Sequence, residues 1–305
     1  MTVTGRVLLG GRDSVPLRSA WAVLHRVTRD TGGPIDSVRT DGAGRYQMRL
    51  PRPRSAADSA AVYVVSTWYD SLAYFTLPLN VLGRPAVRAE DLVVYPTTRN
   101  TPQIQLARRL ITIGHAAADG TREVLEILEL LNSGLTTRVT DDTLVPTWAG
   151  AIPSSALQFQ GGQGDISPEA MKLVGDKVFV LGPIPPGQVK QLSYGYMLPA
   201  GETRIALPID QPTQDLNLLV EDTSAVVAAP ALVALGVQEI EQRRFAAYRA
   251  GPLAPGDRVT IGLPGGAFRP QMLLPYVIAL LAVAMTGALV WALRRRPLAP
   301  SETRS

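Results

Sequence analysis

Short stretches that alternate apolar and polar residues, separated by turns rich in glycine and proline, make up most of the chain. Residues 2–9, 19–27 and 91–95 have this pattern, which is typical of strands with one buried face. Residues 35–50 form two such stretches around a Thr-Asp-Gly-Ala-Gly turn, where Gly42 and Gly44 are expected to take the positive φ angles of a tight hairpin. The pattern predicts an all-β fold.

One stretch, residues 121–131, is ambiguous between helix and strand. It carries a glutamate at every third position, a spacing that also suits one face of a helix. We favour a strand, because Asp119–Gly120 precedes it and Asn132–Ser133–Gly134 follows it, as hairpin loops would.

Turn signals and a linker divide the chain into parts. Residues 1–98 form one predicted β-sandwich, and a change of composition separates them from residues 103–264. In this second region short strands recur at roughly 8 to 12 residue spacing, which suits one large β-sandwich or two small ones with a seam at 208–210. We therefore expect two or three β-sandwich domains.

Residues 272–293 break the pattern, because they contain no charged side chain. As a helix this segment measures roughly 33 Å, enough to cross a bilayer core of about 30 Å. A buried helix of a soluble domain is the alternative, but such helices have a polar face and this segment lacks one. We predict one C-terminal transmembrane helix, with Tyr276 and Trp291 at the membrane interface.

The charges beside this segment predict its orientation. Arg294, Arg295 and Arg296 follow it directly, so the positive-inside rule places the short basic tail, residues 294–305, in the cytoplasm. The expected location is the bacterial inner membrane, crossed once, with the β-domains on the periplasmic side. Met1 opens directly into strand sequence, so we expect export by an upstream signal or by another route.

Small residues form a stripe on the predicted transmembrane helix. Ala284, Gly287, Ala288 and Ala292 are spaced so that they share one side. Small side chains let helices approach closely in lipid, where the hydrophobic effect contributes little to their association. This stripe is a candidate docking face for another helix, although alanine also simply fills an isolated span.

Composition excludes several kinds of chemistry. The absence of cysteine removes disulfides, thiol nucleophiles and cysteine-type metal sites. The net charge is +4, and no basic helix or basic patch interleaved with aromatic residues accompanies it, so we expect no nucleic-acid partner. The charge is better explained by the arginines beside the membrane segment.

The sequence offers no catalytic, cofactor-binding or metal-binding set. The two histidines, His25 and His115, fall in different predicted domains and lack the spacing of a zinc site. The adjacent pairs Asp141–Asp142 and Glu221–Asp222 would point to opposite faces of a strand, so neither is a ready acid–base couple. There is no Gly-x-Ser-x-Gly elbow. We predict a protein that is not an enzyme and uses no cofactor.

Several aromatic residues are of the types that anchor contacts between proteins. Residues of this kind are Trp68–Tyr69, Tyr74–Phe75, Tyr194, Tyr196, Phe245 and Tyr248–Arg249. Each of them alone is better explained as part of a sandwich core with tyrosines at strand ends. Taken together, these residues also fit an interaction surface.

The N-terminal region resembles the carboxypeptidase regulatory-like domain. The matching residues are Gly5–Arg6–Val7, the apolar strand 22–24, and Thr40–Asp41–Gly42 with Gly44–Arg45–Tyr46, where that family has a T-D-x-x-G-x-Y hairpin. The resemblance covers roughly residues 1–98 and implies a transthyretin-type β-sandwich with a non-catalytic adhesion or packing role. A calcium ligand at Asp41 is the alternative to a turn-forming role for that residue.

These observations favour a non-catalytic accessory or scaffold subunit of a larger membrane protein complex. Its expected partners are the other subunits and the lipid bilayer. The host is expected to be a photosynthetic reaction-centre and light-harvesting assembly or a respiratory assembly, a choice that no motif supports. The alternative is an envelope adhesion or carbohydrate-binding module.

Overall fold

A computed structural model describes residues 1–50, 61–81, 84–100 and 104–264. Within these ranges the chain is all-β, as the alternating pattern predicts, and a single 3₁₀ turn, η1 (Pro168–Ala170), is its only helical element. No helix among these residues is long and apolar enough to cross a bilayer. The predicted transmembrane segment 272–293 lies outside them.

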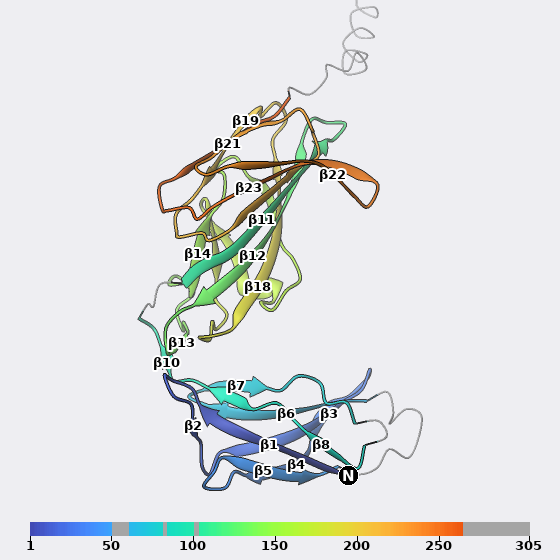
Figure 1. The fold of residues 1–305 in the computed structure, drawn as a ribbon, viewed down its shortest axis with the longest axis vertical. Coiled ribbons are helices and arrows are strands. Elements are labelled where there is room, and N and C mark those ends of the chain that lie inside the picture. The colour runs from blue at the N-terminus through green and yellow to red at the C-terminus, as the bar shows by residue number, and fades with distance from the viewer. Residues whose placement is uncertain (51–60, 82–83, 101–103, 265–305) are drawn as a thin grey trace, which may run out of the picture. The chain divides into compact units, whose positions relative to one another are not determined.

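Two sheets enclose the first hydrophobic core (Figure 1). The five-stranded sheet is built around β1 (Thr2–Leu9), and its other strands are β2 (Val15–Pro16), β5 (Arg45–Arg49), β8 (Ala86–Arg88) and β9 (Leu92–Val94). The four-stranded sheet has the order β4 (Gly32–Arg39), β3 (Trp21–Val27), β6 (Val62–Tyr69) and β7 (Leu72–Phe75). Its inner face carries Ala22, Leu24 and Val65, all fully buried.

The hairpin that carries the family resemblance is stabilised by its turn. The Asp41 carboxylate accepts hydrogen bonds from the backbone N–H groups of Ala43 and Arg45, both at 2.8 Å, as a turn-forming residue does. Gly44 has φ +71°, and a Cβ there would lie 2.5 Å from the Val7 carbonyl oxygen. The prediction for Gly42 is wrong, because the backbone takes the left-handed conformation at Gly44 and not at Gly42.

A two-stranded ladder follows the first core in the chain. β10 (Thr97–Thr98) pairs in parallel with β13 (Thr137–Arg138). Next to it, the Asp70 carboxylate accepts from both the backbone N–H and the hydroxyl of Thr97, at 2.6 and 2.8 Å. These hydrogen bonds also lower the pKa of Asp70.

A seven-stranded sheet dominates the remaining described residues (Figure 1). Its order is β15 (Leu157–Gly161), β18 (Val189–Leu198), β12 (Arg122–Asn132), β11 (Ile104–Ala116), β20 (Leu216–Val220), β23 (Arg243–Ala250) and β22 (Val233–Ile240). The ambiguous stretch 121–131 is a strand, β12, which pairs with β11 on one side and β18 on the other.

Two small sheets complete the second core. One contains β14 (Trp148–Ala151), β17 (Lys177–Val180) and β16 (Met171–Val174), and the other contains β19 (Arg204–Pro208), β24 (Arg258–Gly262) and β21 (Val226–Ala228). Buried side chains from both join the inner face of the seven-stranded sheet in one cluster. This cluster contains residues on both sides of 208–210.

Candidate functional site

An apolar sheet face with exposed aromatic rings is the most distinctive surface of the described chain. On the outer side of the four-stranded sheet, Trp21 in β3 is 50% exposed, Trp68 in β6 is 66% exposed and Phe75 in β7 is 59% exposed. Exposure of this size is uncommon for large aromatic side chains, which usually bury most of their surface. We call Trp21, His25, Trp68 and Phe75 the aromatic face.

Strand register explains why these side chains share one face. Ser66 in the central strand β6 pairs with Val23 of β3 on one side and with Phe75 of β7 on the other. Because side chains alternate along a strand, Trp21 and Trp68 then lie on the same side as these residues, opposite the buried Ala22. The outward positions of three neighbouring strands therefore form one surface.

Two polar contacts order this face. The His25 Nε2 and the Ser66 hydroxyl oxygen are 2.7 Å apart. The centroids of the His25 and Phe75 rings are 6.2 Å apart. At the other end, the Arg39 guanidinium carbon lies 4.7 Å from the centre of the Trp21 ring, a cation–π contact. The face thus combines apolar area with fixed polar groups at its border.

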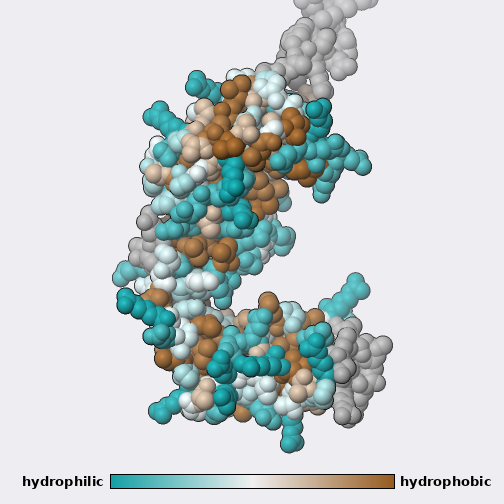
Figure 2. Space-filling view, in the orientation of Figure 1, coloured by the Kyte–Doolittle hydropathy of each residue, from teal (hydrophilic) through white to brown (hydrophobic). Residues whose placement is uncertain are grey.

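The surface around these rings is also apolar. Val27 and Val62, which pair across β3 and β6, are each 42% exposed, and Leu77 just after β7 is 64% exposed. In Figure 2, apolar patches interrupt an otherwise polar surface. Large exposed apolar patches mark interaction sites in soluble domains.

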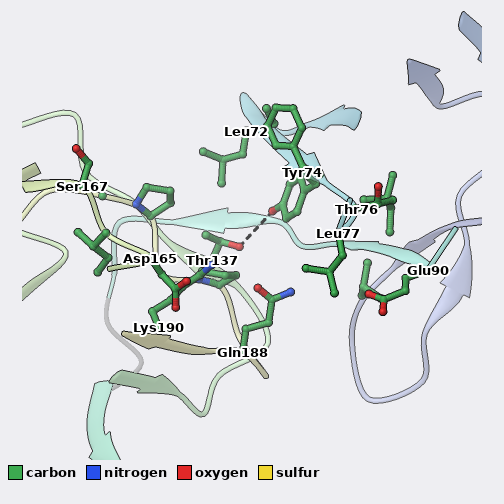
Figure 3. A pocket seen from close by; sticks show the side chains of 18 of the residues that line it. Leu72, Tyr74, Thr76, Leu77, Glu90, Thr137, Asp165, Ser167, Gln188 and Lys190 are labelled. Carbon is green, nitrogen blue, oxygen red and sulfur yellow. Dashed lines mark hydrogen bonds between the residues drawn. The ribbon is translucent and has the colours of Figure 1, made fainter. Parts of the chain in front are cut away.

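A second candidate is the cavity drawn in Figure 3. It measures about 670 Å³, and its labelled lining includes Tyr74, Thr137, Asp165, Gln188 and Lys190. The Tyr74 hydroxyl lies 3.3 Å from the Thr137 hydroxyl oxygen and donates to the Tyr95 carbonyl oxygen at 3.1 Å. These two hydroxyls bond to each other and to the backbone, not to a base, so neither is an activated nucleophile.

A buried ion pair lies inside the second core. Arg109 in β11 donates two hydrogen bonds to the Glu126 carboxylate in β12, at 2.8 and 3.1 Å, and the two side chains are 3% and 0% exposed. The hydroxyls of Tyr194 and Tyr196 in β18 donate to the same carboxylate at 3.2 and 2.9 Å.

Burial and the Glu126 carboxylate raise the pKa of both tyrosines well above the usual value. Burial is the largest single effect on Arg109 and opposes its charge, but Glu126, Tyr194 and Tyr196 together outweigh it, so the pKa of Arg109 is raised. Since every group in this network has a partner and none faces solvent, we interpret the network as structural.

A second ionic cluster surrounds His115. Its Nδ1 lies 2.8 Å from the Asp222 carboxylate, and its backbone N–H donates to the Glu221 carboxylate at 2.9 Å. Arg122 binds Asp222 and the Pro264 carbonyl oxygen, while Arg243 binds Glu221. In the described chain no hydroxyl is hydrogen-bonded to the His115 ring, so the cluster lacks the nucleophile of a catalytic triad.

This cluster corrects one sequence interpretation. His115 itself belongs to strand β11, which continues to Ala116. Glu221 and Asp222 do not diverge on opposite faces of a strand, because β20 ends at Val220 and both carboxylates bend towards His115. Among the described residues, no group of three or more acidic or histidine side chains is arranged to hold a metal ion.

The predicted membrane residues cannot be placed. Tyr276, Trp291, Arg294, Arg295 and Arg296, and the docking stripe Ala284, Gly287, Ala288 and Ala292, all lie outside the described residues and stay predictions. Of the aromatic residues singled out in sequence, Trp68 and Phe75 are exposed, whereas Tyr194 and Tyr196 are buried in the second core. Trp21, which sequence reasoning treated only as part of a strand, joins the exposed group.

No family model and no curated protein matches the chain. Among solved structures, it is similar to an M1 zinc metallopeptidase from Deinococcus radiodurans, with 12% identity, a TM-score of 0.35, and coverage of 52% of this chain and 42% of that one. It is also similar to a nutrient binding protein from Legionella pneumophila, with 9% identity, a TM-score of 0.32, and coverage of 55% and 68%. The chain thus spans less than half of the metallopeptidase, and similarity at these TM-scores supports no inference about function.

Proposed function

We propose that this protein is a non-catalytic, membrane-anchored accessory subunit that holds a protein partner against the aromatic face. The exposure of Trp21, Trp68 and Phe75 on one sheet face carries the proposal. Tryptophan is enriched among residues that dominate binding energy at protein interfaces. The apolar segment 272–293 and the arginines that follow it support an anchor, and the resemblance of residues 1–98 to a non-catalytic module agrees with a binding role.

The surrounding surface favours a protein partner. Val27, Val62 and Leu77 extend the apolar area beyond the rings. Protein interfaces have an apolar centre with a polar rim, and Arg39 and His25 supply polar groups beside the rings. The proposed host is a larger membrane protein complex, and no residue of the aromatic face distinguishes a photosynthetic from a respiratory one.

Co-purification tests the proposal. The full chain is extracted from its native membrane in mild detergent, and its bound partners are identified by mass spectrometry. Trp68→Ala should weaken their retention by about tenfold or more, as expected for a truncated interface anchor. Val226→Ala is the matched control, because Val226 in β21 is 72% exposed but lies in another sheet. Equal retention of partners by both variants would contradict the proposal.

Orientation is tested separately. Protease added to intact spheroplasts should digest the β-domains, because we propose that they lie on the periplasmic side of the inner membrane with residues 294–305 in the cytoplasm. A β-domain fragment that survives this treatment and is digested only after lysis would reverse the orientation.

A carbohydrate-binding module is the second candidate, and one observation favours it. The Arg39 guanidinium stacks on the Trp21 ring, which is itself half exposed, and Trp68 is exposed beside it. Exposed aromatic rings with polar groups at their edge also suit the apolar face of a sugar ring. If this reading is right, the chain leaves the membrane as a monomer in mild detergent and binds polysaccharide in affinity electrophoresis, and Trp68→Ala abolishes the retardation.

A further inference from the structure

Three arginines share the outer face of the five-stranded sheet. In that sheet β1 lies between β5 and β8, and Arg6 of β1 is directly opposite Arg45 of β5. Two residues earlier in β1, Thr4 has Gln47 of β5 on one side and Arg88 of β8 on the other. Because side chains alternate along a strand, all of these side chains point away from the first core. The middle of this face is therefore basic.

These side chains surround a hollow of about 400 Å³. Asp41 is the only acidic residue among the described residues that line it, and its carboxylate already accepts two backbone N–H groups of the hairpin turn. The hollow thus combines three guanidinium groups with the hydroxyl of Thr4 and the side-chain amide of Gln47. Donors of this kind around one small space suit an oxyanion.

Two of these arginines have no ion pair in the part of the chain that the structure describes. Arg6 donates through Nε and Nη2 to the Asp91 carboxylate, with an Nε contact of 3.1 Å. Arg45 and Arg88 are exposed, and neither has a carboxylate partner among the described residues. Like charges directly opposite each other destabilise a sheet, and Asp91 offsets only one of the three charges. An anion bound in the hollow would reduce the repulsion that remains.

Guanidinium geometry favours phosphate among the oxyanions. Each guanidinium presents a planar fork of N–H donors that matches both carboxylate and phosphate. A carboxylate has two oxygens, enough for one fork, whereas a terminal phosphate group has three strong acceptor oxygens. Arg45 and Arg88 belong to strands on opposite sides of β1, so a ligand between them must accept hydrogen bonds from two directions. A tetrahedral phosphate group meets this requirement.

We propose that the outer face of the five-stranded sheet is a phosphate-binding site, in which Arg45 and Arg88 bind a terminal phosphate group from two sides and Arg6 borders it. We call these three residues the arginine site. Its ligand is inorganic phosphate or the same group at the end of a lipid headgroup, as in phosphatidic acid. The arginine site belongs to a different sheet from the aromatic face, so it goes beyond the proposed function and does not depend on it.

Isothermal titration calorimetry of the full chain in maltoside detergent, with inorganic phosphate as the probe, tests this proposal. The unaltered chain should bind phosphate, and Arg45→Gln and Arg88→Gln should each weaken binding by about tenfold or more, because each removes a charged donor fork. Arg45→Lys keeps the charge but not the fork and should bind with intermediate affinity. Acetate should bind more weakly than phosphate, because one carboxylate engages one fork.

A second titration identifies the source of the phosphate group. Its probe is glycerophosphate, the soluble headgroup of phosphatidic acid. Tighter binding of glycerophosphate than of inorganic phosphate assigns the arginine site to a lipid headgroup, and weaker binding assigns it to free phosphate. Either result supports the site, because both compounds carry the same terminal group.

Arg29 supplies the matched control. It is exposed in the turn between β3 and β4, which belong to the other sheet, and it too has no ion pair within the described ranges. Arg29→Gln should bind phosphate like the unaltered chain. The proposal is overturned if the unaltered chain binds no phosphate, if Arg45→Gln and Arg88→Gln bind it normally, if Arg29→Gln weakens binding equally, or if acetate binds as tightly as phosphate.

Discussion

Removing the buried carboxylate of Glu126 should destabilise the second core severely. Glu126 is completely buried and accepts hydrogen bonds from Arg109, Tyr194 and Tyr196. In Glu126→Leu the arginine charge stays buried, with backbone oxygens as its remaining partners, among them that of Pro208 at 3.0 Å. Breaking a buried ion pair in this way costs about 3–5 kcal/mol.

The two tyrosine hydroxyls add to this cost. Each loses its acceptor in a buried site, and an unsatisfied buried hydroxyl costs about 1–3 kcal/mol. These costs overlap because the groups share one carboxylate, so a total of about 4–6 kcal/mol is expected. That is a large part of the roughly 5–15 kcal/mol that stabilises a typical domain.

The double variant Arg109→Leu with Glu126→Leu separates the charge from the packing. It removes both charges together, and apolar replacement of a buried ion pair is often close to neutral. We therefore expect the double variant to be more stable than Glu126→Leu alone, by about 2 kcal/mol or more. The remaining loss then reports the unpaired hydroxyls of Tyr194 and Tyr196.

Native-state hydrogen exchange of the full chain measures these free energies by region. Peptides from β11 and β12 should lose protection in Glu126→Leu, while peptides from β3 and β6, which belong to the other core, serve as the internal control. The reasoning is refuted if Glu126→Leu costs less than about 1 kcal/mol, or if the double variant is less stable than the single one.

Three further predictions concern packing, pH and metal ions. Gly5→Ala should destabilise the first core by a few kcal/mol in urea unfolding, because a Cβ would lie 2.3 Å from the buried Tyr46 hydroxyl oxygen. The side-chain hydrogen bond from Arg243 lowers the pKa of Glu221 from 4.5 to about 2, so the stability from this pair is present above pH 4.5 and is lost as the pH falls towards 2. Glu221→Gln should make the melting temperature depend less on pH between about 2 and 4.5. Chelator treatment should leave the melting temperature unchanged, and a fall of several degrees would reveal a bound metal ion.

Alternation along the chain was enough to predict the all-β class, and the reason is local. A strand places successive side chains on opposite faces, so burial on one face leaves its mark in any short window. The stretch 121–131 shows the limit of this argument. Its glutamates also fit a helix, and the strand is decided by pairing at both of its edges, with the preceding strand β11 in a hairpin and with β18, which lies distant in sequence. No local window contains the second of these pairings.

Contacts between distant residues explain why the ionic clusters were missed. His115 and the carboxylates of Glu221 and Asp222 are separated by about a third of the chain, and the parallel pairing of β11 with β20 brings them together. Glu126 lies on the inner face of β12, where it meets Arg109 across the β11–β12 ladder. Sequence shows the charges but not the register that pairs them.

The aromatic face could not be predicted from the sequence for a different reason. Alternation in β3 separates Trp21, Val23 and His25 from Ala22 and Leu24, but it does not say which set faces the core. Size and hydrophobicity favour burial of the set with tryptophan, yet the structure buries Ala22 and Leu24 and leaves Trp21 half exposed. A sheet that is apolar on both faces is a poor design for a surface in water, where the outer face is normally polar. The outer face therefore carries apolar area that this sheet does not need for its own core, and the binding role proposed above would use that area.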